Sequence, residues 1–443
     1  MIHSTKINPT KFQVLTIFKW VLILAVLAVI VGSLVAMFLW LLDQVTIVRW
    51  KTSWLLNLLP IAGVLIYFLY HFLGKNAEAG NSLIIDAIHD HQIKVPARMA
   101  PMVLFTTLIT HLFGGSAGRE GTAIQMGGGV AAFMGRKLSL NQVDLRLLLM
   151  TGIAAGFSAV FGTPLAGAFF AVEVIAIGQI QFKEFLPCYF TSILAHLVCL
   201  TWGIHHTVYS IQLLPNQLGA FFHFEPLLFS KAIIAAVCFG LVAFLFVEAH
   251  IQVKTLVNKF ISIKWLIPIV GGSLVIGMSY LLNTQDYLGL GVVAKDDNAV
   301  SIVNAFKTAN LHPFSWFWKL LFTAITLGTG FKGGEVTPMF FIGATLGNTL
   351  AWIMGAPTDL FAAIGFIAVF AGATNTLFAC TIMGCELFGT DFVLYFFVAC
   401  LIARFTSGYS SIYPTQRVGN SGKRVSEHPY NSLQKIWKHL KGK

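Results

Sequence analysis

The sequence predicts an all-α polytopic membrane protein made of two inverted-topology repeats with broken and re-entrant helices. Of 443 residues, 56% are hydrophobic and only 11% are charged. A soluble domain carries about 25% charged residues to solvate its surface. The apolar segments are also evenly spread and do not alternate with a two-residue period, which excludes an outer-membrane barrel. Intrinsic disorder, collagen-like repeats, a coiled coil and a secreted disulfide scaffold are excluded by the same composition.

The basic residues predict the orientation of the chain in the membrane. Lys6 and Lys11 precede the first apolar run, and the segment 417–443 carries seven basic residues against the single acid Glu427. Because Lys and Arg beside a span mark the cytoplasmic side, we expect both termini to be cytoplasmic, in the inner membrane of a bacterium. The net charge of +11 therefore does not indicate a nucleic-acid partner, and a DNA-binding role for the basic tail is the less favoured alternative. The seven basic residues are Arg417, Lys423, Arg424, Lys435, Lys438, Lys441 and Lys443.

The expected domain organisation follows from these ends. Residues 1–15 form a cytoplasmic N-terminus, 16–413 the transmembrane domain and 414–443 a basic cytoplasmic tail with no C-terminal regulatory domain. The first apolar run is too long for the core of a signal peptide. The six cysteines all lie in apolar segments without metal spacing and indicate small buried hydrophobes.

Two kinds of apolar segment occur along the chain. A straight span needs roughly 20 apolar residues, and the candidates are 16–42, 53–73, 186–203, 230–248 and 265–283. Others are short, closely spaced and separated by Gly-rich breaks, which lipid tolerates only where protein or a polar cavity covers the backbone. The short segments therefore indicate a transport pathway. These segments are 100–113, 121–135, 145–161, 163–178, 314–327, 336–354, 358–371, 376–390 and 392–405.

An internal repeat supports this interpretation. Aligning Glu120 with Glu335 gives an offset of 335 − 120 = 215, and Glu173 with Glu386 gives 386 − 173 = 213. The segments 118–132 and 333–347 then correspond. The sequence thus predicts a first repeat over about 53–203 and a second over about 230–405, meeting at mid-membrane as in many secondary transporters.

Glycines at two predicted helix starts indicate an anion site. Gly118 and Gly121 flank Arg119 and Glu120 before a helix expected from about Thr122. In the second repeat Gly334 precedes Glu335 and Val336, before a helix expected near Thr337. Glycine lets backbone N–H groups approach a ligand, and the first N–H groups of a helix lack internal partners. With the positive helix end they can hold an anion without a fixed cation. Alternatively, glycines serve only close packing, as expected for Gly152/Gly156 and Gly343/Gly347.

Four glutamates lie within apolar segments. A carboxylate at bilayer depth is costly and is usually protonated, paired or functional. Glu120 and Glu335 stand at the predicted anion sites, so each could compete with an anion when charged and vacate the site when protonated. We therefore assign them to gating and proton transfer. For Glu173 and Glu386, a structural hydrogen bond late in a helix is the preferred interpretation.

These residues resemble a known family. GREGT (118–122), GGEVTPMFFIGATLG (333–347) and GTPLAGAFFAVE (162–173) are similar to signatures of the CLC chloride channel and transporter family, and SSIYPTQ (410–416) falls where the family presents an anion-coordinating tyrosine. The resemblance implies a homodimer with one anion pathway per subunit. It also implies that Glu120 is the gating glutamate, that Tyr413 is the inner ligand, and that the backbone near Glu335 and Val336 forms the central site.

Three departures resemble the fluoride–proton antiporter branch of that family. The first signature reads GNSLI (80–84), with Asn81 and Ser82 as the expected anion-facing pair. Val174 stands where chloride–proton exchangers usually carry an inner glutamate, and Glu335 replaces an apolar residue. The resemblance implies fluoride export coupled to proton entry through Glu120 and Glu335. The expected anion ligands are Asn81, Ser82, Gly118, Arg119, Gly121, Gly334, Val336 and Tyr413. A chloride channel or a chloride/proton antiporter of the same family is the alternative.

One motif in the sequence is also found in enzymes. Gly114–Gly118 satisfies the GxSxG pattern around Ser116, with His111 and His196 as candidate bases of an intramembrane serine protease. The strand–turn–helix context that gives this pattern meaning is missing from the sequence. No HExxH, Walker motif or cluster with metal-ligand spacing occurs in the sequence, so we expect a transporter without a cofactor or metal.

Overall fold

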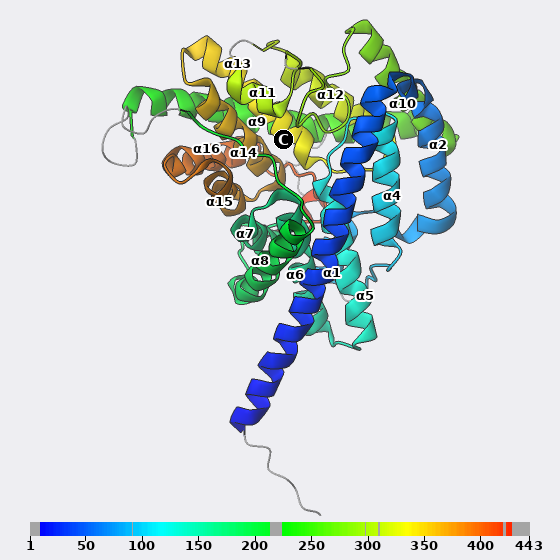
Figure 1. Cartoon of the computed structure of the whole chain (residues 1–443), viewed down its shortest axis with the longest axis vertical. Coiled ribbons are helices and arrows are strands. Elements are labelled where there is room, and N and C mark those ends of the chain that lie inside the picture. Colours follow the sequence, from blue (N-terminus) through cyan, green and yellow to red (C-terminus); the bar gives the residue numbers. More distant parts are fainter. Residues whose placement is uncertain are drawn as a thin grey trace, which may run out of the picture.

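A computed structural model describes residues 9–90, 92–212, 224–296, 298–308, 311–419 and 422–427. The segment 1–8 of the expected N-terminus and 428–443 of the expected basic tail lie outside the described residues. The described chain is almost entirely helical, which confirms the predicted fold class (Figure 1). Its one sheet pairs β1 (Ala176–Ile177) with β2 (Arg417–Val418) in parallel.

The long apolar segments form long helices. The helix α1 (Pro9–Lys51) extends beyond the other helices at its N-terminal end (Figure 1). It is followed by η1 (Ser53–Leu58), α2 (Leu59–Leu69), η2 (Tyr70–Gly74) and η3 (Lys75–Ala77). The other long apolar segments become α8 (Phe185–Thr201) after η4 (Phe182–Glu184), α9 (Pro226–Phe260), and η6 (Lys264–Leu266) with α10 (Ile267–Leu281). In the described part of the chain, seven helices are long and apolar enough to cross a membrane.

The Gly-rich segments form most of the remaining helices. In the first half these are α4 (Met99–Leu112), α5 (Glu120–Lys137), α6 (Gln142–Phe161) and α7 (Pro164–Glu173). In the second half they are α12 (Ser315–Gly328), α13 (Val336–Met354), α14 (Thr358–Thr374), α15 (Leu377–Phe388) and α16 (Val393–Thr406). Two of them, Gln142–Phe161 and Val336–Met354, have 20 and 19 residues and are long enough to cross a membrane, so the expectation of short helices is wrong for these two. The sequence reasoning missed α3 (Asn81–His89), α11 (Ile302–Lys307), the short sheet and η8 (Val425–Glu427).

The two halves pack alike, since α5 lies on α6 as α13 lies on α14. A Cβ on Gly152 would lie 2.5 Å from the Gly127 carbonyl oxygen, and one on Gly343 would collide with the Gly365 carbonyl. These helices therefore approach backbone to backbone, as expected where small residues line a membrane helix pair. This confirms the packing role predicted for Gly152 and Gly343.

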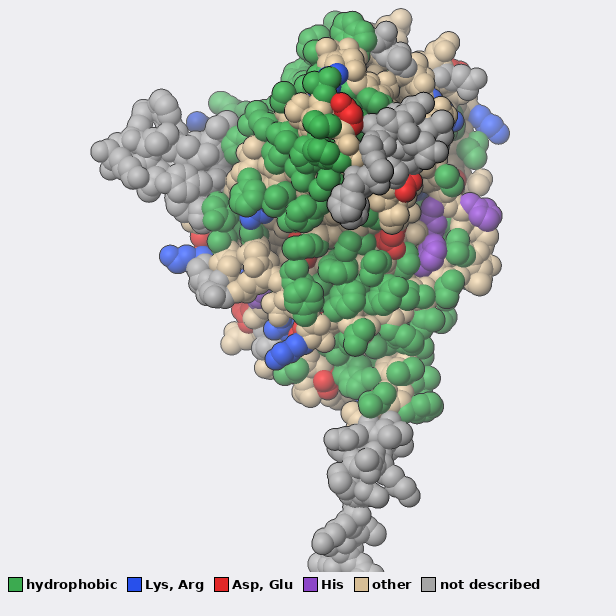
Figure 2. Space-filling view, turned by 90° about the vertical axis from the view of Figure 1, so that its left-hand side faces the viewer, with side chains coloured by type: hydrophobic (Ala, Val, Ile, Leu, Met, Phe, Trp, Pro, Cys, Tyr) green, Lys and Arg blue, Asp and Glu red, His purple; other side chains and the backbone are tan. Residues whose placement is uncertain are grey.

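The outside of the molecule is apolar. Leu186 and Leu197 of α8 and Phe405 of α16 are 73%, 49% and 72% exposed. Figure 2 shows one face on which hydrophobic side chains spread widely while charged side chains are few. Such a surface suits lipid contact and is too apolar for a water-facing monomer.

Candidate anion pathway

The two repeats meet at a pair of glycines. Gly118 N–H donates to the Gly334 carbonyl at 2.6 Å, and Gly334 N–H donates to the Gly118 carbonyl at 2.8 Å, in an antiparallel bridge. A Cβ on Gly334 would lie 2.7 Å from the backbone nitrogen of Gly121. Only glycine allows this approach, so the predicted meeting of 118–132 with 333–347 is confirmed.

The side chain of Glu120 reaches the first turn of α13, a helix of the other repeat. Glu120 begins α5 and is fully buried. Its carboxylate accepts a hydrogen bond from Thr337 N–H at 3.0 Å and another from the Thr337 hydroxyl. Arg119 N–H donates to the same carboxylate at 3.1 Å, and Arg119 Nε lies 3.8 Å from it. The carboxylate therefore sits at the N-terminal end of α13, where the unpaired N–H groups of a helix favour negative charge.

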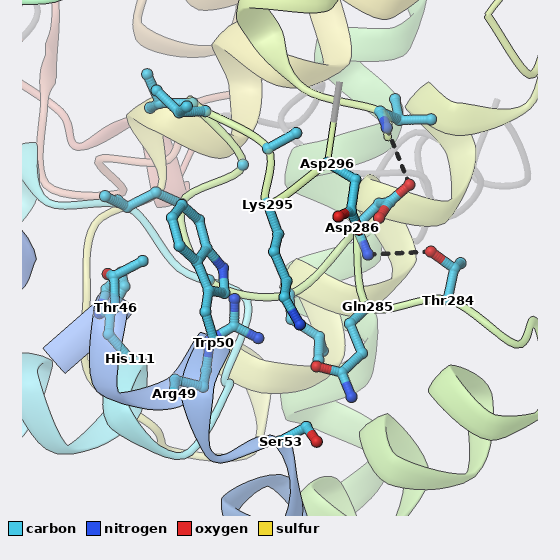
Figure 3. Close-up of a pocket in the computed structure, with 18 of the residues that line it drawn as sticks. Thr46, Arg49, Trp50, Ser53, His111, Thr284, Gln285, Asp286, Lys295 and Asp296 are labelled. Carbon is cyan, nitrogen blue, oxygen red and sulfur yellow. Dashed lines mark hydrogen bonds between the residues drawn. The ribbon is translucent and has the colours of Figure 1, made fainter. Parts of the chain in front are cut away.

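Of three cavities in this region, the smallest is lined by Glu120 itself. A pocket of about 480 Å³, named the outer pocket here, lies at the Lys51 end of α1 and is lined in part by Arg119 and Thr207 (Figure 3). A small cavity of about 20 Å³ is lined by Arg119 and Thr207 as well, and by Glu120 and Thr337. A cavity of this size holds about one water-sized particle. The second large pocket, of about 450 Å³, is lined by Glu335 and not by Glu120.

This inner pocket gathers the remaining polar residues that the sequence singled out. Asn81 and Ser82 at the start of α3, Glu335 before α13, and Tyr413 all line it. The Tyr413 hydroxyl and Asn81 Oδ1 are buried and have no hydrogen-bond partner among the described residues. A buried polar atom without a partner is costly. The two atoms therefore mark a place where a ligand or water is needed.

The geometry changes the expectation for two of the predicted anion ligands. The N–H groups of Gly118 and Gly334 donate to each other's carbonyl, so here they join the repeats and do not face an anion. Gly121 packs against Gly334, because a Cβ on Gly121 would lie 3.0 Å from the Gly334 Cα. Val336 begins α13, directly before the Thr337 N–H that holds Glu120.

Comparison with known proteins identifies the family. Residues 62–408 match the family model described as voltage gated chloride channel. A "Chloride/fluoride channel protein" of Pseudomonas syringae pv. tomato is 43% identical over 411 residues, covering 91% of this chain and 87% of that one. The chain belongs to the CLC family.

Solved CLC structures have the same fold. The crystal structure of a CLC-type fluoride/proton antiporter matches with a TM-score of 0.84 and 32% identity, covering 91% of this chain and 98% of that one. A slow cyanobacterial Cl⁻/H⁺ antiporter matches with a TM-score of 0.72 at 18% identity, covering 92% and 96%. The second likeness concerns the fold alone.

The other two buried-segment glutamates of this CLC protein hold helix ends. Glu173, the last residue of α7, accepts from Phe378 N–H at 3.1 Å and Ala379 N–H at 2.9 Å, at the start of α15. Glu386 near the end of α15 accepts from the N–H groups of Leu165 and Ala166 at 2.9 and 2.8 Å, at the start of α7. The two acceptor glutamates are separated by the same number of residues as the corresponding donors Leu165 and Phe378, since 386 − 173 = 213 and 378 − 165 = 213. This reciprocal arrangement agrees with the structural interpretation of both glutamates.

The protease constellation is not assembled. The Ser116 hydroxyl pairs with the Thr323 hydroxyl at 2.9 Å. Both ring nitrogens of His111 are engaged by the carbonyls of Thr107 and Ala117, and His196 lies against His206. Among the described residues, neither His111 nor His196 is positioned as a base for Ser116, in contrast to what a serine nucleophile needs.

Sequence reasoning missed two residues of the site. Thr337, which donates hydrogen bonds to the Glu120 carboxylate, is expected from the sequence only as a helix start. A hydroxyl in the first turn of an anion-binding helix is nevertheless a signal for a residue that binds an anion or a carboxylate. Gln416 is fully buried, and its Nε2 donates to the carbonyls of Val174 and Thr374 at 2.8 Å each. It accepts from the Ser411 hydroxyl at 2.6 Å, and that hydroxyl in turn accepts from Tyr413 N–H at 3.0 Å. Gln416 therefore fixes the Tyr413 segment against both repeats, and no local pattern announces this.

Proposed function

We propose that this CLC protein exchanges a halide for protons across the membrane and exports fluoride as protons enter. The observation that carries the proposal is the position of the Glu120 carboxylate on Thr337, at the start of α13. A helix start is an anion site. A carboxylate that occupies it excludes the transported anion while it is charged and must leave before the anion can bind.

Proton binding supplies the means of leaving. A protonated Glu120 no longer carries the charge that holds it at the helix end, so it competes less well with a halide for Thr337 N–H. An anion can then move between the outer cavity and the inner pocket, and the carboxylate can return only after it releases its proton. One side chain thus couples the two movements.

Several features favour fluoride as the anion. The cavity beside Glu120 and Thr337 has a volume of about 20 Å³, which suits a small ion. Fluoride is tightly hydrated, so its site needs close hydrogen-bond donors. The amide of Asn81 and the hydroxyls of Ser82 and Tyr413 can supply them. The solved structure of a CLC-type fluoride/proton antiporter supports the same choice, and the relative named "Chloride/fluoride channel protein" agrees with either halide.

Glu335 is the second proton-transfer group of the proposal. It lines the inner pocket, and its Oε2 would lie 3.6 Å from a Cβ on Gly121, close to the start of α5. Glu335 lines the inner pocket, whereas neither the outer pocket nor the small cavity beside Glu120 is lined by Glu335. Glu335 would therefore carry protons between the inner pocket and Glu120, a task that Val174 cannot perform.

Proteoliposomes test the proposal directly. Protein is reconstituted with fluoride or chloride inside, and efflux is followed with an ion electrode together with pH. We expect fluoride efflux to exceed chloride efflux and to drive proton uptake. Glu120→Gln should retain some fluoride flux and lose proton movement, whereas the exposed Glu427→Gln should behave as wild type.

The alternatives correspond to other results. Chloride flux equal to or above fluoride flux would favour a chloride transporter, and fluoride flux without protons would favour a channel. Full proton coupling in Glu120→Gln would refute the role of Glu120. Glu335→Ile with unchanged coupling would remove Glu335 from the proton route. A protein that moves neither ion would reopen the question of an enzyme.

The proposal includes the placement of the protein. We place it in the inner membrane of a bacterium with both termini cytoplasmic, since basic residues flank both ends of the transmembrane domain. We also propose a homodimer, because the CLC resemblance implies one and the exposed apolar residues of α8 and α16 leave room for a partner. Light scattering of the purified protein tests the dimer, and accessibility of a terminal tag in intact cells tests the orientation.

A further inference from the structure

Much of the outer pocket is built from parts of the chain to which the proposed exchange assigns no role. The end of α1 supplies Arg49 and Trp50, and the loop after α10 supplies residues 283–296 (Figure 3). The pocket of about 480 Å³ shares Arg119, Thr207 and Val292 with the small cavity beside Glu120. It therefore adjoins the small cavity beside the gate and is much larger than that cavity.

Arg49 is the unusual residue of this pocket. Its side chain comes from the last turn of α1 and is only 6% exposed. Its Nη1 is buried with no hydrogen-bond partner, and no carboxylate lies within 4.0 Å of it among the described residues. A buried charge without a partner is strongly unfavourable. No acid among the described residues neutralises Arg49, so a bound anion would lower this cost.

The surroundings strengthen the positive charge. Lys319 of α12 is fully buried and donates to the carbonyls of Tyr287 at 3.1 Å and Gly289 at 2.7 Å. Arg49 Nη2 approaches the same Gly289 and would lie 3.7 Å from a Cβ placed there. Two cations thus flank one loop, and Lys319 likewise has no carboxylate within 4.0 Å among the described residues.

The acids of the pocket do not neutralise Arg49. Asp43 and Asp296 are exposed to solvent. Asp286 accepts a hydrogen bond from Val300 N–H at 2.9 Å, as Figure 3 shows. The exposed Lys295 adds a further cation to the rim. Among the described residues of the pocket, Arg49 is therefore a buried cation without an acid partner, whereas Arg119 lies 3.8 Å from Glu120.

We infer that Arg49 forms a second anion site, an outer station where the transported halide binds before or after it passes Glu120. The guanidinium supplies N–H donors and charge in a setting that partly excludes water, where both act more strongly. This inference rests on the proposed function for the identity of the anion. The site itself follows from the unpartnered Arg49 Nη1 and from the lining residues that the two cavities share.

Binding and stability measurements test the site apart from transport. Full-length protein in detergent is titrated with sodium fluoride at constant ionic strength, by calorimetry and by thermal unfolding. Because a hydrogen bond to a charged group corresponds to roughly a tenfold change in affinity or more, we expect Arg49→Gln to weaken fluoride binding about tenfold. Arg49→Lys should restore part of it. The exposed Arg98→Gln serves as the matched control and should leave binding unchanged.

Thermal unfolding gives a readout that a merely structural arginine would not change. A ligand that binds only the folded protein raises its melting temperature with concentration. We expect fluoride to stabilise wild type more than Arg49→Gln. Without anion, Arg49→Gln should be as stable as wild type or more stable, since the unpaired charge is gone. In proteoliposomes it should need more fluoride for half-maximal flux while keeping the fluoride-to-proton ratio.

The outcomes separate the two proposals. If fluoride transport is coupled and Arg49→Gln binds and responds to fluoride as wild type does, the outer station is refuted. If wild type moves no fluoride but binds it in an Arg49-dependent way, the proposed function fails and the anion site stands. If sulfate stabilises the protein through Arg49 and fluoride does not, the site belongs to an oxyanion and is not a station for the transported halide.

Discussion

Glu173 provides a sharp test of which buried glutamates are structural. Its carboxylate, 6% exposed, accepts two N–H groups at the start of α15, at 3.1 and 2.9 Å. Glu173→Gln keeps one oxygen and turns an N–H₂ group toward the second donor, so one bond is lost. A hydrogen bond to a charged group contributes about 1.5–3 kcal/mol, and a charge at a helix start adds up to about 2 kcal/mol.

Removing the charge also removes its desolvation cost. We therefore expect Glu173→Gln to lower the free energy of unfolding by about 2–3 kcal/mol. Glu386 makes the same contacts at the start of α7 but is exposed to solvent. Glu386→Gln should accordingly cost only about 1 kcal/mol. The structural interpretation thus predicts an order of effects as well as a size.

Equilibrium unfolding in mixed micelles gives the stability, and the proteoliposome assay gives the fluoride-to-proton ratio of the same variants. A structural Glu173 requires a loss of stability with an unchanged ratio. If Glu173→Gln changes the free energy of unfolding by less than about 0.5 kcal/mol and abolishes proton movement, Glu173 is a proton carrier and the reasoning is wrong. The double variant tests whether the two caps, which join the same pair of helices, act independently.

Three further predictions concern contacts at the pathway. Gly334→Ala should abolish transport, because its Cβ would lie 2.7 Å from Gly121 N. Gly277→Ala is the control, since a Cβ there meets open space. A Gly334→Ala variant that still transports would contradict the packing argument. Thr337→Val should hold the Glu120 carboxylate less tightly by about 1.5–3 kcal/mol, which should raise the fluoride-to-proton ratio in liposomes. Thr337→Ser should restore the wild-type ratio. An unaltered ratio in Thr337→Val would argue against Glu120 as the gate. Gln416→Ala should leave the carbonyls of Val174 and Thr374 unpaired, lowering the free energy of unfolding by about 2 kcal/mol and weakening fluoride binding near Tyr413. Calorimetry and unfolding check this last prediction, and a stable variant with normal affinity would speak against it.

The sequence by itself determined the membrane class, most of the helices and the resemblance to the family, but not the short helices α3 and α11. Composition decides the membrane class because a chain with 11% charged residues cannot solvate a surface of its own. Helix positions follow from apolar length and glycine breaks, since both act locally along the chain. The internal repeat can be recognised from the Glu120/Glu335 and Glu173/Glu386 offsets, because two halves that pack alike need the same residues at the same spacing.

Only the tertiary structure decided which groups face which. The N–H groups of Gly118 and Gly334 bond to each other, so the donor that receives the Glu120 carboxylate is Thr337, 217 residues away. The orphaned guanidinium of Arg49 and the fixing of Tyr413 by Gln416 also have no local signature. They arise because a hydrogen bond or a buried charge depends on partners brought together by folding, and those partners lie far apart in the sequence.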